Sequence, residues 1–148
     1  MHALYDFAGH PEYIEPIREE VQKIVAEEGW TKSSMAKMHK LDSFLKETCR
    51  MHPLVSGFDS VLQLMAVGSR RVVLKPFTFS NGVTVSKGTL VGAPVSAIHM
   101  DETLYDRPNE FDGLRFFNLR QKHGDLPQYH CANTNTNCLT FGTGRHAW

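Results

Sequence analysis

The spacing of apolar residues in this chain changes once, near residue 54, and this change limits the possible folds more than any other feature. Before it, apolar residues recur with the helical period, and charged residues occupy the positions between them. The first stripe predicts an amphipathic helix that begins near Glu15, because Pro16 fits only a first helical turn, and that ends at Gly29. Its apolar residues are Ile14, Ile17, Val21, Ile24 and Val25.

Two further helices are expected before the change. Thr31 is a suitable N-cap for a short helix that runs to Met38. A third helix follows and ends before Pro53. One side of this third helix carries Leu41, Phe44, Leu45 and Thr48. We therefore expect a helical region over residues 11–52.

From residue 54 the spacing favours short strands. The stretch 71–75 is typical of a strand, and two β-rich triplets flank Asn81-Gly82, which is a strong hairpin signal. Residues 90–91 predict another short strand, and Pro94 predicts a short helix that runs towards His99. The sequence thus predicts a small antiparallel sheet over residues 68–92.

Past Phe116 the chain is polar, rich in turn-forming residues and without either period. A segment of this length without secondary structure is usually functional or disordered. Neither an internal repeat nor a linker is evident. The prediction is one α+β domain over residues 1–148, mainly helical, with a small antiparallel β-sheet.

The charge composition and the cysteines narrow the class of protein. Lys plus Arg equal Asp plus Glu at 16 each, so no basic excess indicates a nucleic-acid partner. Three cysteines do not form a disulfide framework, and an odd number fits a reducing compartment. No signal peptide or transmembrane segment is recognisable. The chain as given is therefore expected to be cytoplasmic.

Three charged residues stand out, although their spacing alone favours ordinary roles. Glu47 and Arg50 share one face of the third helix, opposite its apolar side, and a helical wheel predicts a solvated surface ion pair. Arg115 lies between Leu114 and Phe116 and is expected to be an edge-strand arginine. It would enter an interior only if a carboxylate compensated its desolvation.

Other patterns are weaker. Two histidines and two cysteines invite a zinc interpretation, but their spacing matches none of the paired short-loop patterns; they are His130, Cys131, Cys138 and His146. Cys49 is accompanied by no nucleophile elbow and by no base that spacing would place beside it. The chain has no P-loop, and Gly142–Arg145 follows no predicted strand, which weakens a nucleotide-binding interpretation.

Six segments, taken in order, carry a more specific signal. They are HPEYIEPIREE, WTK, LDSFLKETCR, RVVLKPFTFSNGVTVSKGT, YDRPNEFDGLRF and FGTGRHA, and they cover nearly the whole chain. In this order they resemble the cytochromes P450, the haem-thiolate monooxygenases, of a filamentous-fungal type. The resemblance implies the C-terminal portion of that fold, with helices over 11–52, a sheet over 68–92, and the meander and haem loop over 105–148.

The resemblance also assigns site residues. Glu47, Arg50 and Arg115 match the Glu-Arg-Arg triad that locks the third helix to the meander, which reverses the expectation from the helical wheel. Residues near the end of the chain match the start of the haem loop, where a Phe packs beneath the porphyrin, glycines allow close approach and a cation meets a propionate. These residues are Phe141, Gly142, Gly144, Arg145 and His146, with Arg71 as a second propionate candidate.

The family pattern places its iron-ligating cysteine at position 148, which is Trp148. An indole N–H has no lone pair available for iron, whereas the chemistry needs a thiolate that promotes O–O cleavage. The resemblance therefore predicts no catalytic residue and no metal ligand in this chain, no stable haem binding, and truncation at both ends.

Intact members of the family use haem, oxygen and electrons from an NADPH-dependent reductase to hydroxylate an apolar small molecule. For this type we expect a secondary metabolite and a location at the endoplasmic-reticulum membrane. This chain is then an inactive monooxygenase-like protein. Two alternatives stay open, a non-catalytic binding or scaffold module for a pathway partner and a zinc-binding domain.

Overall fold

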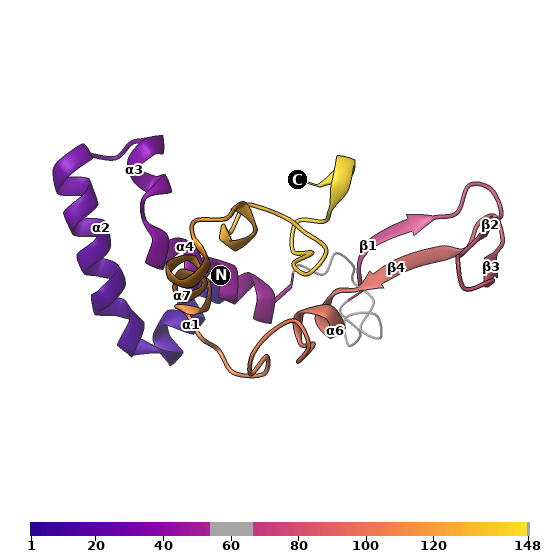
Figure 1. Cartoon of the computed structure of the whole chain (residues 1–148), viewed down its shortest axis with the longest axis horizontal. Coiled ribbons are helices and arrows are strands. Elements are labelled where there is room, and N and C mark those ends of the chain that lie inside the picture. Colours follow the sequence, from indigo (N-terminus) through magenta and orange to yellow (C-terminus); the bar gives the residue numbers. More distant parts are fainter. Residues whose placement is uncertain (54–66, 148) are drawn as a thin grey trace.

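The computed structural model describes residues 1–53 and 67–147, and Figure 1 shows a helical body from which a β-arm extends. This mainly helical architecture with small antiparallel sheets confirms the predicted α+β class. The α-helices are α1 (His2–Gly9), α2 (Ile14–Glu28), α3 (Lys32–Ala36), α4 (His39–Met51), α6 (Val95–His99) and α7 (Arg115–His123). The 3-10 helices are η1 (Pro11–Tyr13), η2 (Pro127–Tyr129) and η3 (Gly144–His146).

α2 is the amphipathic helix that the first apolar stripe predicts. It ends at Gly29, which has a φ of 68°, a left-handed value that glycine adopts without a steric penalty. Only Ile17 of the stripe is fully buried, so α2 lies along the outside of the body (Figure 1). α1, which no sequence pattern predicted, precedes it.

Thr31 caps α3 as predicted. Its hydroxyl accepts a hydrogen bond from the Ser34 N–H at 3.0 Å, and the Ser34 hydroxyl accepts one from the Thr31 N–H at 2.9 Å. This reciprocal pair is a capping box. The helix ends at Ala36, two residues before the predicted end at Met38.

α4 lies at the centre of the body and contacts α1, α2, α6 and α7. The Ser43 hydroxyl joins α4 to α7, since it donates to the Gly113 carbonyl at 2.9 Å and accepts from the Phe117 N–H at 3.0 Å. Glu20 of α2 accepts hydrogen bonds from the N–H groups of Lys40 and Leu41. α2 thereby caps the start of α4, where negative charge is favourable.

The β-arm consists of two antiparallel pairs, β1 (Val67–Val72) with β4 (Leu90–Pro94) and β2 (Phe77–Thr78) with β3 (Thr84–Val85). The hairpin predicted across Asn81-Gly82 is confirmed, and Gly82 has a φ of 86°. The strand predicted over 71–75 is displaced, because β1 ends at Val72. Val73 instead bonds the Lys87–Thr89 turn through both its N–H and its carbonyl.

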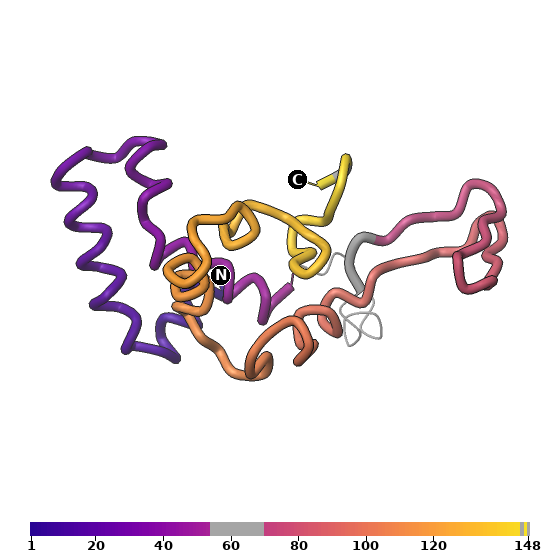
Figure 2. Tube along the Cα trace, in the orientation of Figure 1, coloured from indigo at the N-terminus to yellow at the C-terminus, as the bar shows by residue number. Residues whose placement is uncertain are grey.

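The expectation that regular structure stops past Phe116 is wrong at its start, because residues 115–123 form α7. The buried residues of α7 are Arg115, Phe116 and Arg120, so two of the three are charged and the apolar period is hidden. The prediction that Arg115 is an edge-strand residue is also wrong, because Arg115 is the first residue of α7. After α7 the chain returns across the body with only short 3-10 turns (Figure 2).

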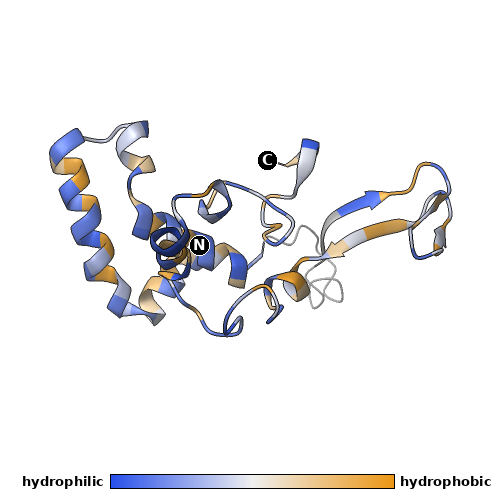
Figure 3. Ribbon diagram, viewed as in Figure 1, coloured by the Kyte–Doolittle hydropathy of each residue, from blue (hydrophilic) through white to orange (hydrophobic). Residues whose placement is uncertain are grey.

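Apolar side chains are distributed unevenly. The buried hydrophobic core lies in the body and comprises Ile17, Met38, Phe44, Val95, Tyr105, Phe116, Cys138 and Leu139. The arm, by contrast, carries several apolar residues in the open, as the orange stretches of Figure 3 show. Among the described helices, none combines the length and the apolar character that crossing a membrane requires.

Candidate functional site

The candidate site begins with two charged residues on α4. Glu47 and Arg50 stand three residues apart, so they lie on the same face of the helix. Both side chains are 0% exposed, and the solvated surface pair predicted from the helical wheel is therefore wrong. A helical wheel is drawn from the sequence of one helix and cannot include what packs against it. In the structure, the chain between α6 and α7 covers this face of α4.

Glu47 receives two guanidinium groups. Arg50 donates to both carboxylate oxygens, from Nη2 to Oε1 at 2.7 Å and from Nε to Oε2 at 2.8 Å. Arg115, at the first turn of α7, donates from Nε to the same two oxygens at 3.1 and 3.2 Å. The structure thus brings Glu47, Arg50 and Arg115 together in one buried network. Paired charges and full hydrogen bonding are what burial of such groups requires.

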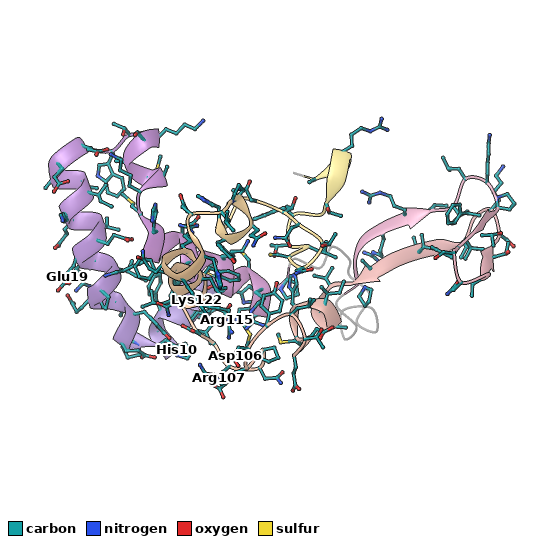
Figure 4. All side chains as sticks on the ribbon, viewed as in Figure 1. His10, Glu19, Asp106, Arg107, Arg115 and Lys122 are labelled. Atoms are coloured by element: carbon teal, nitrogen blue, oxygen red, sulfur yellow. The ribbon has the colours of Figure 1, made fainter. Side chains whose placement is uncertain are left out.

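Main-chain carbonyls complete the network. Arg115 donates to the carbonyls of Asp106, Arg107 and Glu110, and Figure 4 shows it reaching from α7 towards this turn. Arg50 donates to the carbonyls of Pro108 and His99, at 2.8 and 2.7 Å. Arg107 has a φ of 46°, a left-handed value rare for a residue with a side chain. The two arginines therefore fix a turn whose backbone would otherwise be unfavourable.

The network holds one negative side chain, Glu47, and two positive ones, Arg50 and Arg115. The groups around it compensate this excess of positive charge. Carbonyl oxygens point their negative ends at the guanidiniums, and the Tyr105 ring lies 5.1 Å from Arg50 Cζ. Burial raises the pKa of Tyr105, which keeps its hydroxyl protonated, and that hydroxyl donates to the Asn137 carbonyl at 2.8 Å. Tyr105 thus joins the network to the segment before the last loop.

His99 makes a second connection to that segment. Its Nδ1 lies 3.0 Å from the Arg50 carbonyl, which can only accept, and its Nε2 lies 3.0 Å from the Leu139 N–H, which can only donate. These partners assign the neutral tautomer with the proton on Nδ1. His99 is 0% exposed. Sequence reasoning assigned it no role, because partners 49 and 40 residues away leave no local signal.

The last loop, residues 140–147, follows Leu139 directly in the chain. The Thr140 hydroxyl donates to the Cys49 carbonyl of α4 at 3.4 Å, and the Gly142 N–H donates to the Leu139 carbonyl at 3.0 Å. Gly142 and Gly144 have φ values of 82° and 68°. Nothing lies within 4 Å of a Cβ placed on Gly144, so its backbone conformation accounts for the glycine in this structure.

The structure brings the remaining predicted site residues together only in part. Phe141 is half-buried, whereas Arg145 is exposed in η3. Arg71 lies on the β-arm, exposed, with its guanidinium on the Arg70 carbonyl. The His146 side chain and Trp148 lie outside the described residues.

A haem-thiolate site needs a thiolate in the loop, and the donor set does not supply one. Cys138 is buried, with its sulfur 3.7 Å from the Thr140 hydroxyl. Cys49 and Cys131 lie at the junction of α4 with the segment after η2 and are half-buried. Position 148 holds an indole, which has no lone pair for iron. The residues present therefore do not fit axial thiolate ligation, although the exposed Arg145 carries the charge that an anionic group would need.

The zinc alternative gains no support. Among the described side chains, which do not include that of His146, no three from His, Cys, Asp or Glu are grouped so that they could hold a metal ion. The His130 ring contacts the Asp125 carboxylate at 3.0 Å instead. The Cys131 N–H donates to the Asp42 carboxylate.

Comparison with known proteins gives a consistent result. The profile of the family described as Cytochrome P450 matches residues 1–147. Similar curated proteins include the cytochrome P450 monooxygenases janQ of Penicillium janthinellum and paxQ of Penicillium paxilli, each 44% identical over 99% of this chain. Cytochrome P450 monooxygenase 103 of Postia placenta is 37% identical over 99% of it. The chain spans 27% of the length of each of these relatives.

Proposed function

This chain belongs to the cytochrome P450 family, and we propose that it forms the part of a single monooxygenase domain that braces the haem loop. A complete monooxygenase of this family, with a cysteine at the position of Trp148, would bind haem and take electrons from an NADPH-dependent reductase. It would use oxygen to hydroxylate an apolar small molecule of fungal secondary metabolism. Residues 1–148 contribute the Glu-Arg-Arg network, the meander and the start of the haem loop to that domain.

One observation carries the proposal, the unbroken set of hydrogen bonds from Glu47 to the last loop. Glu47 binds Arg50, the Arg50 carbonyl binds His99, and His99 binds the Leu139 N–H. Leu139 stands two residues before Phe141, where the haem loop begins. A loop that must hold a large cofactor in a fixed orientation needs such support from rigid elements.

The exposed arm supports the view that this chain belongs to a larger domain. Leu74 and Phe77 are 77% and 56% exposed. Large apolar side chains exposed to this extent are typical of a face that another part of the protein covers. The family assignment supplies that other part, since the relatives are several times longer than this chain.

The proposal includes inactivity of the chain as given, because Trp148 occupies the ligand position. Adding haem to the purified chain and reducing it with dithionite under carbon monoxide should give no thiolate-type Soret shift. An indole cannot supply the bond on which that spectrum depends. A thiolate-type shift would show that this part of the proposal is wrong.

A chimera separates the bracing role from the missing ligand. Residues 1–148 would replace the matching segment of the janQ protein, once with Trp148 and once with Trp148→Cys. If the segment braces a haem loop, both chimeras should fold, and only the cysteine form should show the thiolate-type shift and oxidise the relative's substrate. A soluble, folded cysteine chimera without this shift would contradict the proposed bracing role.

A further inference from the structure

A cavity of about 200 Å³ lies between α4, α7 and the polar segment that follows α7. Four of the residues that line it are buried, namely Lys46, Tyr105, Phe116 and Cys138. Residues 136–137 line it as well and are exposed, so the cavity is open to solvent on their side. The proposed function makes no use of this cavity.

Lys46 brings a buried positive charge to the cavity. It is 1% exposed, and in the part of the chain that the structure describes no carboxylate forms an ion pair with it. Its ammonium donates to the carbonyls of His130 and Asn133, at 2.8 and 3.4 Å, and lies 5.1 Å from the centre of the Phe116 ring. These groups attract a cation but carry no net negative charge, whereas buried charges are usually paired with opposite ones.

The carboxylates nearest to Lys46 along α4 are engaged elsewhere. Asp42, about one helical turn before it, binds the Arg120 guanidinium. Glu47 belongs to the buried arginine network. An ammonium has three N–H donors, and carbonyls take two of those of Lys46. The third remains for an acceptor in the cavity that this residue lines.

The other walls of the cavity suit an apolar ring. Leu104, Leu119 and Phe116 supply apolar surface. The Tyr105 hydroxyl donates to the Asn137 carbonyl at 2.8 Å, which fixes two lining residues against each other before any ligand binds. A preformed apolar pocket with a few polar groups is typical of small-molecule sites. A dry cavity of about 150 Å³ holds one benzene molecule, so about 200 Å³ has room for a ring with one carboxylate.

We propose that this cavity binds a small aromatic monocarboxylate, with the carboxylate on the Lys46 ammonium and the ring against Leu104 and Leu119. The ligand then supplies the negative charge that the buried ammonium lacks, through a charge-assisted hydrogen bond. An amide of the same shape offers an acceptor without the charge, so the cavity should prefer the acid. The proposal concerns this cavity alone and holds whether or not the chain braces a haem loop.

The test uses benzoate as the probe and benzamide as its neutral counterpart. Each is titrated against a low concentration of the 148-residue protein, and saturation transfer to the ring protons, followed by NMR, gives the dissociation constant. We expect benzoate to bind about tenfold more tightly than benzamide, because hydrogen bonds to charged groups contribute more than neutral ones. Equal dissociation constants, or benzoate binding that does not saturate, would overturn the proposal.

Three variants locate the site. Lys46→Met removes the ammonium and should weaken benzoate binding about tenfold, to the level of benzamide. Lys40→Met is the matched control, because it removes the same charge from α4 outside the cavity, and it should leave the preference unchanged. Leu119→Phe keeps the ammonium and fills part of the cavity, so it should weaken both ligands and tests the site independently of the folding of Lys46→Met. Undiminished benzoate binding by Lys46→Met or Leu119→Phe, or an equal loss in Lys40→Met, would contradict the proposal.

Discussion

Glu47 is the residue on which the buried network depends. Its carboxylate is the only negative side chain between the guanidiniums of Arg50 and Arg115 among the residues described, and it also accepts the Asp112 N–H at 3.1 Å. A buried charge that loses its partner keeps its desolvation penalty. Removal of this one charge therefore leaves two unpaired cations in the interior.

We expect Glu47→Gln to destabilise the chain by about 3–5 kcal/mol, the usual cost of breaking a buried ion pair. A loss of that size is a large fraction of the stability of a typical domain. The midpoint of urea unfolding, followed by circular dichroism, measures it. Glu15→Gln is the matched control, because Glu15 pairs with Arg18 on the surface of α2, and it should leave the midpoint unchanged. Equal effects of both changes would contradict a dominant role of Glu47.

At the scale of elements, the contact between α4 and the segment before α7 depends on Gly113. A Cβ built on Gly113 would lie 2.7 Å from Phe44 Cδ2 and 3.3 Å from Tyr13 Cδ1. Phe44 is 0% exposed and cannot move without disturbing its packing. The absence of a side chain at this position thus lets Ser43 reach the Gly113 carbonyl.

Gly113→Ala should therefore destabilise the chain by about 1–3 kcal/mol, the usual cost of overpacking. Gly9→Ala provides the control, because nothing lies within 4 Å of a Cβ at Gly9 and alanine is a better helix former. Thermal unfolding of both variants gives the comparison. A Gly113→Ala protein as stable as the Gly9→Ala protein would show that Phe44 repacks freely.

At the scale of the whole molecule, the arm differs from the body. The arm consists of two separate two-stranded sheets. Several of its apolar side chains are exposed, namely Leu74, Phe77, Phe79, Val83 and Leu90. Two-stranded sheets are marginally stable alone, and unpaired edges favour association. The arm is consequently the part of the described structure most in need of a covering surface.

The purified chain should therefore self-associate with rising concentration in sedimentation velocity. Leu74→Lys combined with Leu90→Thr should shift it towards monomer, because both side chains are exposed and the changes remove apolar surface. The midpoint of unfolding of the body should stay the same. A wild-type chain that melts cooperatively as a monomer or dimer would instead favour the binding-module alternative.

Much of the local structure could be predicted from the sequence. The stripe of α2, the Thr31 cap and the Asn81-Gly82 hairpin each depend on residues within a few positions of one another. α7 could not be predicted in this way, because two of its three buried residues are arginines. These arginines can be recognised as the buried face of α7 only once it is known that Glu47 pairs with Arg115 and Asp42 with Arg120.

The sequence by itself determined α2, the cap of α3, the Asn81-Gly82 hairpin and the family, because these depend on residues close together in the chain or on the order of its motifs. The tertiary structure buries Glu47 and Arg50, as the family resemblance implied and the helical wheel did not, and it alone revealed that His99 connects Arg50 to Leu139. A helical wheel describes one helix, whereas burial of Glu47 and Arg50 depends on segments 49 to 68 residues away that cover them. Because those segments cover α4, the Glu47–Arg50 ion pair is buried and not exposed on the surface.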